Sequence, residues 1–499
     1  MNESDYLRLA AGCDRLLAAK HGDRARLAIG MLHVIHEHPS WLAQYRRLLD
    51  PTLTPLRERA LPRGARDLLR MARGFRGALG ARVDPAPPRD GALLDVLVVS
   101  HLNDSQQLAR QDDFYFGAMP AMLRERGAKT LVALVDHRGG AETRGPMDAL
   151  PERILLPQYL PTAGEMALWR QCAATRADLT RESRAARDPF DRALARLAAE
   201  QALAAGTAAN LRLYARVLEL CSALRPRIVL TTFEGDASER MVFLAARHAA
   251  ATTLRVGYQH TRLLPRAHAI RRALATPALP CDPDVVLTLG AATQAMLESA
   301  NPGGVRYIIY GSHRRTAPAV PPAARTRAAR CLVLPDAEPA EHAMLYNFTL
   351  ECARQLPDIT FVFRPHPVSG TTLRRVGRAP VDELPANLSV DASESLHAQA
   401  AGVRCCLYRA SSAVFHAVLG GARPLYVARP REIPIDPLAA LPSGRTVVTT
   451  PGEVAALARE SAWPGSDAAA CAWSYCDRYV APLRPSALDD LLRLQRHDD

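Results

Sequence analysis

The chain has 499 residues, 48% of them hydrophobic, and a formal net charge of +12. This length predicts more than one domain, and the apolar content is ample for buried cores. A basic surplus suits nucleic acid, an anionic membrane or an anionic substrate. Aromatic residues make up only 5% of the chain and do not interleave with basic runs, so we expect no nucleic-acid partner.

Residues 1–90 are predicted to form a basic, helical N-terminal extension. Arg63, Arg66, Arg70 and Arg73 recur there at helical spacing, opposite an apolar stripe. Such a helix can lie on anionic lipid or pack its apolar stripe on the protein, so a peripheral contact with the inner membrane stays open. No signal peptide opens the chain and no apolar run approaches the roughly 20 residues of a membrane span, which predicts a cytoplasmic protein.

From residue 93 onward, short apolar segments alternate with helical ones, as in parallel sheets covered by helices on both faces. Long helices are expected at 163–225. The predicted strands of a first series lie at 94–100, 130–136, 153–156, 227–233 and 253–258. Those of a second series lie at 284–289, 305–310, 331–334, 359–363, 388–391, 404–408, 424–428 and 446–449. We predict an α/β protein of two doubly wound domains facing a cleft, 91–280 and 281–465, with helices at 466–499 that pack back on the body.

The stretch Phe-Val-Phe-Arg-Pro-His-Pro at 361–367 ends an apolar run in a proline-locked turn. A buried parallel strand delivers such groups to the rim of its sheet, where α/β proteins bind ligands. Arg364 and His366, held in place by Pro367, can donate hydrogen bonds to a phosphate. His366 can also return a proton to a leaving phosphate. The alternative is a purely structural turn.

A second such stretch ends a strand at Arg409 and continues with Ser411 and Ser412 into an apolar helix that carries His416. A serine at a strand-to-helix junction is a natural N-cap. The N–H groups and dipole of the same helix can bind an anion, and Arg409 could assist or be a surface charge. Together with 361–367, this stretch predicts a phosphate-bearing ligand.

Acidic and polar residues close two strands of the first series. Glu234, followed by the flexible Gly235, is the candidate general base. Gln259 and His260 end the next strand, and we expect them to line the same cleft. Arg262 follows and could attract an anionic group. A weaker candidate set, His101 with residues 112–117, follows the first strand and could shape the acceptor side.

Other classes of chemistry lack their motifs. The histidines show no HxH or HExxH spacing, and no metal site is predicted. Walker A, GxGxxG and nucleophile-elbow sequences are also missing, which excludes P-loop kinases, Rossmann dehydrogenases and serine hydrolases. The ten cysteines form no CxxC pair, so we expect free thiols.

Residues 93–450 resemble a GT-B glycosyltransferase of bacterial surface-polysaccharide biosynthesis. Arg-Pro-His366-Pro367 is similar to the His-Pro motif of bacterial polysialyltransferases, capsule Kdo transferases and teichoic-acid polymerases. Ser411-Ser412 resembles their serine phosphate motif, and Phe233-Glu234-Gly235 their acidic element. Many such enzymes carry Glu where this chain has His416. The resemblance implies a GT-B-like fold with 91–280 on the acceptor side and 281–465 binding a nucleotide sugar, without any other cofactor.

The resulting hypothesis is an inverting, metal-independent transfer of a sugar, such as a nonulosonic acid or Kdo, from a CMP-linked donor. The acceptor would be a lipopolysaccharide, O-antigen or capsule glycan, free or as a glycolipid. Glu234 would act as the base, while Arg364, His366, Ser411 and Ser412 stabilise the departing phosphate. Two alternatives remain: a polyol-phosphate transferase with a CDP-linked donor, and a non-catalytic GT-B-like scaffold.

Overall fold

The structure is a computed structural model of the chain. It describes residues 2–20, 22–34, 42–45, 48, 71–72, 74–77, 93–102, 107, 112–137, 152–271, 279–301, 303–315, 329–366, 384–391, 393–430, 432–460, 463 and 466–494. Most of the basic stretch at 63–73 lies outside these residues, so the structure does not bear on its predicted contact with a membrane. Within the described residues, no helix is long and apolar enough to cross a membrane.

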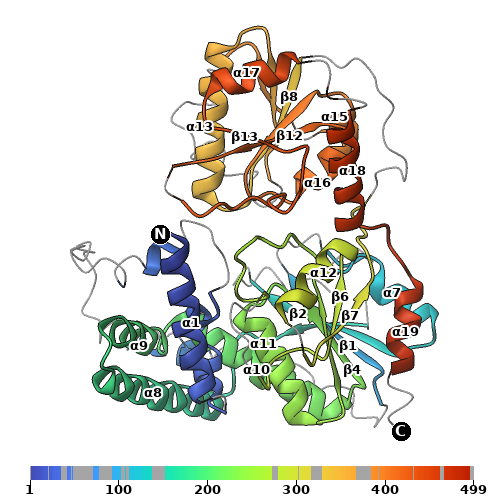
Figure 1. Cartoon of the computed structure of the whole chain (residues 1–499). Helices are drawn as coiled ribbons and strands as arrows, with labels where there is room; N and C mark the ends of the chain where they lie inside the picture. The colour runs from blue at the N-terminus through green and yellow to red at the C-terminus, as the bar shows by residue number, and fades with distance from the viewer. Residues whose placement is uncertain are drawn as a thin grey trace.

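Two parallel sheets stand one above the other (Figure 1). The first has the strand order β3-β2-β1-β4-β5-β6-β7. Its strands are β1 (Val96–Leu102), β2 (Thr130–Asp136), β3 (Arg153–Leu156), β4 (Ile228–Thr232), β5 (Leu254–Tyr258), β6 (Val285–Thr288) and β7 (Arg306–Ile309). Its helices are α7 (Met119–Glu125), α8 (Thr162–Ala185), α9 (Pro189–Gln201), α10 (Ala205–Leu224), α11 (Ala237–Ala249) and α12 (Ala291–Ala300).

The second sheet has the order β10-β9-β8-β11-β12-β13. Its strands are β8 (Arg330–Leu334), β9 (Thr360–Phe363), β10 (Leu388–Val390), β11 (Cys405–Tyr408), β12 (Arg423–Val427) and β13 (Thr446–Val448). Its helices are α13 (Pro339–Gln355), α15 (Leu396–Ala401), α16 (Ala413–Leu419), α17 (Pro451–Arg459) and α18 (Asp467–Tyr479). Every predicted strand and the long helices of 163–225 are found, and the two helix-covered parallel sheets confirm the fold class.

Most strand residues are apolar and buried because helices cover both faces of each sheet. In β8, Cys331 and Val333 join the cluster under α13, whereas Leu332 and Leu334 join the cluster under α16 and α18. Successive side chains of a strand point to opposite faces, so a strand buried on both sides reads as a continuous apolar run. This is why the strands could be located from sequence.

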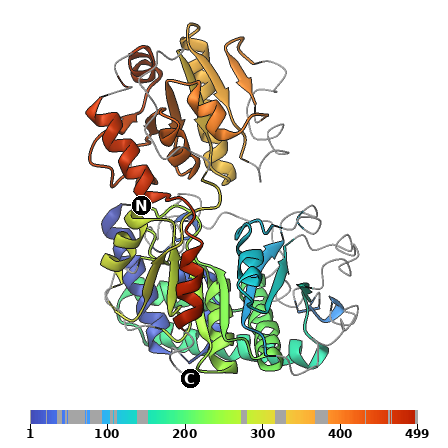
Figure 2. The ribbon, with the colours of Figure 1, turned by 90° about the vertical axis from the view of Figure 1, so that its right-hand side faces the viewer.

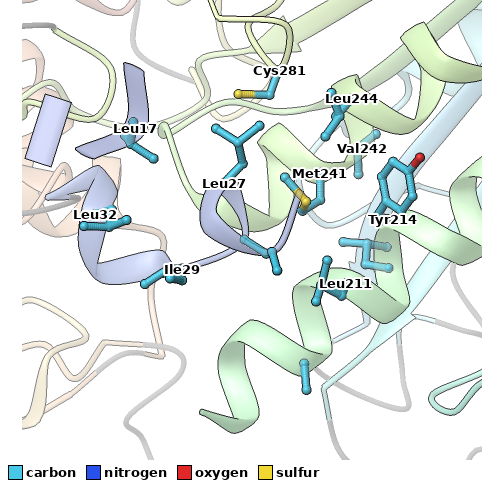
Figure 3. Packing of buried hydrophobic residues seen from close by; sticks show 14 of the residues in the cluster. Leu17, Leu27, Ile29, Leu32, Leu211, Tyr214, Met241, Val242, Leu244 and Cys281 are labelled. Atoms are coloured by element: carbon cyan, nitrogen blue, oxygen red, sulfur yellow. The ribbon is translucent and has the colours of Figure 1, made fainter. Parts of the chain in front are cut away.

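The N-terminal helices extend the core of the first domain. The segments α1 (Glu3–Ala19), α2 (Arg24–Leu27), η1 (Gly30–His33) and η2 (Ala43–Tyr45) pack on α8 to α11 in one apolar cluster. Figure 3 shows Leu27 and Ile29 of this segment near Leu211 of α10 and Met241 of α11. The described part of the predicted extension is therefore part of the first domain.

The predicted domain boundary at 280 is wrong. Strands β6 and β7 pair with β5 in the first sheet, so the chain leaves this domain only after β7. The prolines at 277–283 lie between two neighbouring strands of one sheet. The C-terminal helices divide: α18 packs on α16 in the second domain, whereas α19 (Ser486–Leu494) places Leu488 and Leu491 in the core of the first (Figure 2).

Candidate active site between the two sheet edges

In each sheet, successive strands are added first toward one edge and then toward the other, so the strand order reverses at one point. The reversal falls between β1 and β4 in the first sheet and between β8 and β11 in the second. Ligands of open parallel sheets bind outside the carboxyl ends of the strands at this point. Glu234 follows β4, Ser411 and Ser412 follow β11, and His366 follows β9, the neighbour of β8. Glu234 and the serine pair therefore lie at the two reversal points, and His366 lies one strand away from the second.

The two carboxyl edges face each other. Nη2 of Arg262, after β5, lies 3.0 Å from Oδ2 of Asp336, after β8. This ion pair joins the domains and leaves the Arg262 charge opposed by a carboxylate. Arg262 is thus an interdomain contact, which argues against its predicted role as a spare cation for an anionic ligand.

The loop that carries Glu234 is held by the carboxyl group of Glu239, for which the sequence suggested an ion pair with Arg240 instead. Oε2 of Glu239 accepts the backbone N–H groups of Glu234, Gly235 and Asp236 at 2.9, 2.8 and 2.9 Å. Gly235 has φ +91°, and a Cβ there would lie 2.5 Å from the carbonyl carbon of Ala269. Since only glycine fits this backbone, the turn fixes where Glu234 points.

Glu234 has a histidine neighbour. Nε2 of His260 lies 3.4 Å from Oε1 of Glu234, whose side chain is 26% exposed. Burial, reinforced by the charge of Arg314, lowers the pKa of His260 to about 3, so its imidazole is neutral near pH 7. Burial and the Glu234 charge also raise the pKa of Asp236 to about 7. An accessible carboxylate beside a neutral imidazole is an arrangement suited to a general base.

Aromatic rings and further histidines complete the first edge. Nδ1 of His101 lies 2.8 Å from Nε2 of His137. The Tyr115 ring lies 5.6 Å from the His101 ring and 5.1 Å from the His260 ring, centre to centre. The weaker candidates, His101 and Tyr115, thus join the surroundings of Glu234. His137 was missed, although its place directly after β2 could have flagged it.

A small pocket opens beside Glu234. Gln259 is buried in its wall, but its amide is used by the main chain: Nε2 donates to the Thr261 carbonyl, and Oε1 accepts the Leu289 N–H at 3.2 Å. Gln259 therefore lines the cleft as predicted, but its side-chain amide is already hydrogen-bonded to the main chain. The lining residues are Phe233, Glu234, Gln259, Thr261, Arg262, Leu263, Leu264, Ala267 and Ile270.

At the second edge, Arg364 and His366 differ in what they contact. Nη1 of Arg364 donates to the Glu394 carbonyl at 2.8 Å and to Oε1 of Gln399 at 2.7 Å, which ties it to its own domain. The half-buried His366 has a pKa lowered by burial, an effect that the Asp336 charge opposes. A neutral His366 can donate one N–H to a phosphate. Pro367 lies outside the described residues.

The serine pair lies where β11 meets α16. Ser411 is 5% exposed, and Ser412 occupies the N-cap position without a capping hydrogen bond from its side chain. Simple capping therefore does not explain Ser412. His416 is half-buried one turn along α16, and burial, together with the charges of Arg314 and Arg315, lowers its pKa to about 4.

Arg409 has neither of its predicted roles. It is 1% exposed, and its guanidinium contacts Glu341 and Glu432, while Nη1 donates to the Val427 carbonyl at 2.6 Å. Such a side chain stabilises the domain and is closed to ligands. Among the described residues, no group of three or more His, Cys, Asp or Glu side chains is placed to hold a metal ion.

Comparison with known proteins gives structural likenesses only. No protein-family model and no curated sequence matches the chain. The glycotransferase of kitacinnamycin is similar at 13% identity over 81% of this chain and 99% of its own, with a TM-score of 0.45. SnogD from Streptomyces nogalater is similar at 15% over 81% and 99%, with a TM-score of 0.41. UDP-GlcNAc 2-epimerase from Methanocaldococcus jannaschii is similar at 8% over 81% and 100%, with a TM-score of 0.43.

Proposed function

We propose that this chain is a GT-B-type glycosyltransferase that moves a sugar from a CMP-linked donor to a bacterial surface glycan. The observation that carries the proposal is that Glu234 lies at one reversal point while Ser411 and Ser412 lie at the other, with His366 one strand away after β9. A base on one domain and phosphate-binding groups on the facing domain are what transfer between two bound substrates requires.

In the proposed step, Glu234 takes the proton of an acceptor hydroxyl. The acceptor oxygen forms a bond to the anomeric carbon, and the bond from that carbon to the phosphate oxygen breaks. CMP leaves with the electron pair. His260, neutral and 3.4 Å from Glu234, orients the carboxylate. His366 and Ser412 donate hydrogen bonds to the leaving phosphate, and no metal ion enters the mechanism.

The finer parts of the proposal come from the motif resemblance. These are the CMP-linked nonulosonic acid or Kdo donor, the lipopolysaccharide, O-antigen or capsule acceptor, and inversion at the anomeric carbon. Work at the cytoplasmic face of the inner membrane is proposed from the basic stretch at 63–73 and the lack of a long apolar run. His416 is the departure from the resemblance, and the structure places it on α16 beside the serine pair. A neutral imidazole there can donate to an oxygen of the nucleotide, where Glu could only accept.

The test measures nucleotide binding and transfer with the full chain. Calorimetry should show that CMP binds, and a CMP-linked Kdo or sialic acid should release CMP faster when a capsule or lipopolysaccharide oligosaccharide is present. Glu234→Gln should bind CMP normally but slow transfer by about 10²–10⁴-fold. The control Glu298→Gln changes an exposed carboxylate on α12 and should match the wild type. Wild-type rates in Glu234→Gln would overturn the role of Glu234. A product that retains phosphate would instead support polyol-phosphate transfer, and the absence of nucleotide binding would support a scaffold.

A further inference from the structure

The two predicted phosphate-binding arginines of the second domain are already bound to protein groups. Arg409 is buried among carboxylates, and Arg364 is bound to Gln399. At the edge of the first domain, Arg262 is paired with Asp336. Arg315, after β7, is 1% exposed, and its Nη2 lies 2.6 Å from Oδ1 of Asp477. These four arginines are therefore bound to other groups of the protein and contribute to its structure.

Arg314 is different. Its Nη2 donates to the Phe114 carbonyl at 3.1 Å, and its guanidinium carbon lies 5.0 Å from the centre of the Phe114 ring. Among the residues that the structure describes, no carboxylate lies within 4 Å of it. The residue is exposed, yet the surrounding protein desolvates the guanidinium enough to lower its pKa. The Arg314 guanidinium is therefore partly enclosed by protein but still reachable from solvent.

A chain of ring contacts links Arg314 to the proposed base. The Phe114 ring, on which Arg314 lies, is 4.9 Å from the Tyr115 ring. The Tyr115 ring is 5.1 Å from that of His260, which contacts Glu234. Arg314 thus borders the same edge of the first sheet as the carboxylate.

The charge of Arg314 also reaches the other domain. Burial is the main cause of the lowered pKa values of His260 and His313 in the first domain and of His366 and His416 in the second. In all four histidines, the charge of Arg314 lowers the pKa further. The positive charge of Arg314, which the charges of Glu234 and Asp113 offset only in part, therefore acts on residues of both domains, and a bound oxyanion would complement it.

We propose that Arg314 binds an oxyanion of the donor, held between the two facing sheet edges on the side of Glu234. This inference rests on the proposed nucleotide-sugar function and adds a cation that lies outside its motifs. The oxyanion is either the nucleotide phosphate or a carboxylate on the sugar. A guanidinium offers the paired N–H donors that both groups accept.

The experiment compares CMP, cytidine and CMP-N-acetylneuraminate as probes by calorimetry on the full chain. Arg314→Gln should weaken CMP binding by about 10- to 100-fold, the usual loss for a charge-assisted hydrogen bond, and leave cytidine binding unchanged. If CMP binds normally and only CMP-N-acetylneuraminate is weakened, the oxyanion is the sugar carboxylate. Arg170→Gln, an exposed arginine on α8, is the matched control and should bind all three probes as the wild type does.

Two further variants separate binding from folding. Arg314→Lys keeps the charge and should recover part of the lost affinity. Phe114→Ala removes the ring under the guanidinium, and it should weaken CMP binding less than Arg314→Gln does. Thermal melting of each variant shows whether it is folded. If the wild type binds CMP and a folded Arg314→Gln binds both nucleotides equally well, Arg314 has no such role and the proposed function stands. If the wild type binds neither nucleotide, both proposals are overturned.

Discussion

The two facing edges are built in opposite ways. At the first, the loop of Glu234 is fixed by three hydrogen bonds to Glu239 and by a glycine with no room for a side chain. At the second, the strongest contacts belong to the buried Arg409, while Ser412 makes no capping bond and His366 and His416 are half-buried. At the first edge, the proposed catalytic loop is therefore fixed before any ligand binds. At the second edge, the strongly bonded residue is the buried Arg409, and the proposed ligand-binding side chains have few bonds of their own.

Removing Arg409 should have the largest effect on stability. Arg409→Met leaves Glu341, 3% exposed on its side chain, without its partner, and breaking a buried pair in this way costs about 3–5 kcal/mol. Urea unfolding measures the loss. The matched control is Arg459→Met, which breaks the exposed pair with Asp358 and should leave the unfolding midpoint unchanged. Equal midpoints for the two variants would show that Arg409 is not structural.

A side chain at Gly235 should disturb the first edge nearly as much. Gly235→Ala combines a φ of +91° with a contact of 2.5 Å to the Ala269 carbonyl carbon, which together cost roughly 3 kcal/mol. Gly206→Ala is the control, because a Cβ there meets nothing within 4 Å in α10. It should be neutral or slightly stabilising. A Gly235→Ala protein as stable as Gly206→Ala would mean that the turn has another conformation.

Weakening the Glu239 bonds should affect catalysis more than binding. Glu239→Gln keeps the shape but puts an amide NH2 in place of one of the two carboxyl oxygens that accept backbone N–H groups, so Glu234 becomes less fixed. We expect transfer to slow by about tenfold, equivalent to one such bond, with unchanged CMP affinity. Glu453→Gln removes a similar carboxylate at the start of α17 and should not change the rate. A larger change in CMP affinity than in rate would contradict the division between the edges.

The smallest effect on stability is expected at Ser412. Ser412→Ala removes a hydroxyl that makes no cap, so the unfolding free energy should change by less than about 0.5 kcal/mol while CMP binding weakens. Ser466→Ala is the comparison, because its side chain accepts the Ala469 N–H at 3.1 Å and caps α18. That change should cost about 1 kcal/mol and leave CMP binding intact. The reverse pattern would make Ser412 a structural cap.

The sequence was sufficient for local features and insufficient for distant pairings. Continuous apolar runs located the strands, and the polar residues that end them located Glu234, His260, His366 and the serine pair. The predicted boundary at 280 was wrong because prolines in a loop do not show which sheet the next strands, β6 and β7, will join.

Arginine roles were the hardest to predict. Arg409 finds Glu341 and Glu432 at separations of 68 and 23 residues, which no spacing rule connects. Arg314 follows a short strand in an arginine-rich chain, so its residue type carries little information. What distinguishes it is that no carboxylate among the described residues forms an ion pair with it, and such a property exists only after folding.

The chain passes between the domains twice, and the two passages lie together. The Ser312 N–H donates to the Ala481 carbonyl at 3.1 Å, and a Cβ on Gly311 would lie 2.2 Å from the Pro482 carbonyl oxygen. Because the two connecting segments, at 311–312 and 481–482, contact each other, they can act as a single hinge between the domains. When one domain rotates about a hinge, atoms near the axis move least. Arg314 is two residues from Ser312, so opening the domains would displace the sugar and acceptor ends of the site while the anion stayed almost in place.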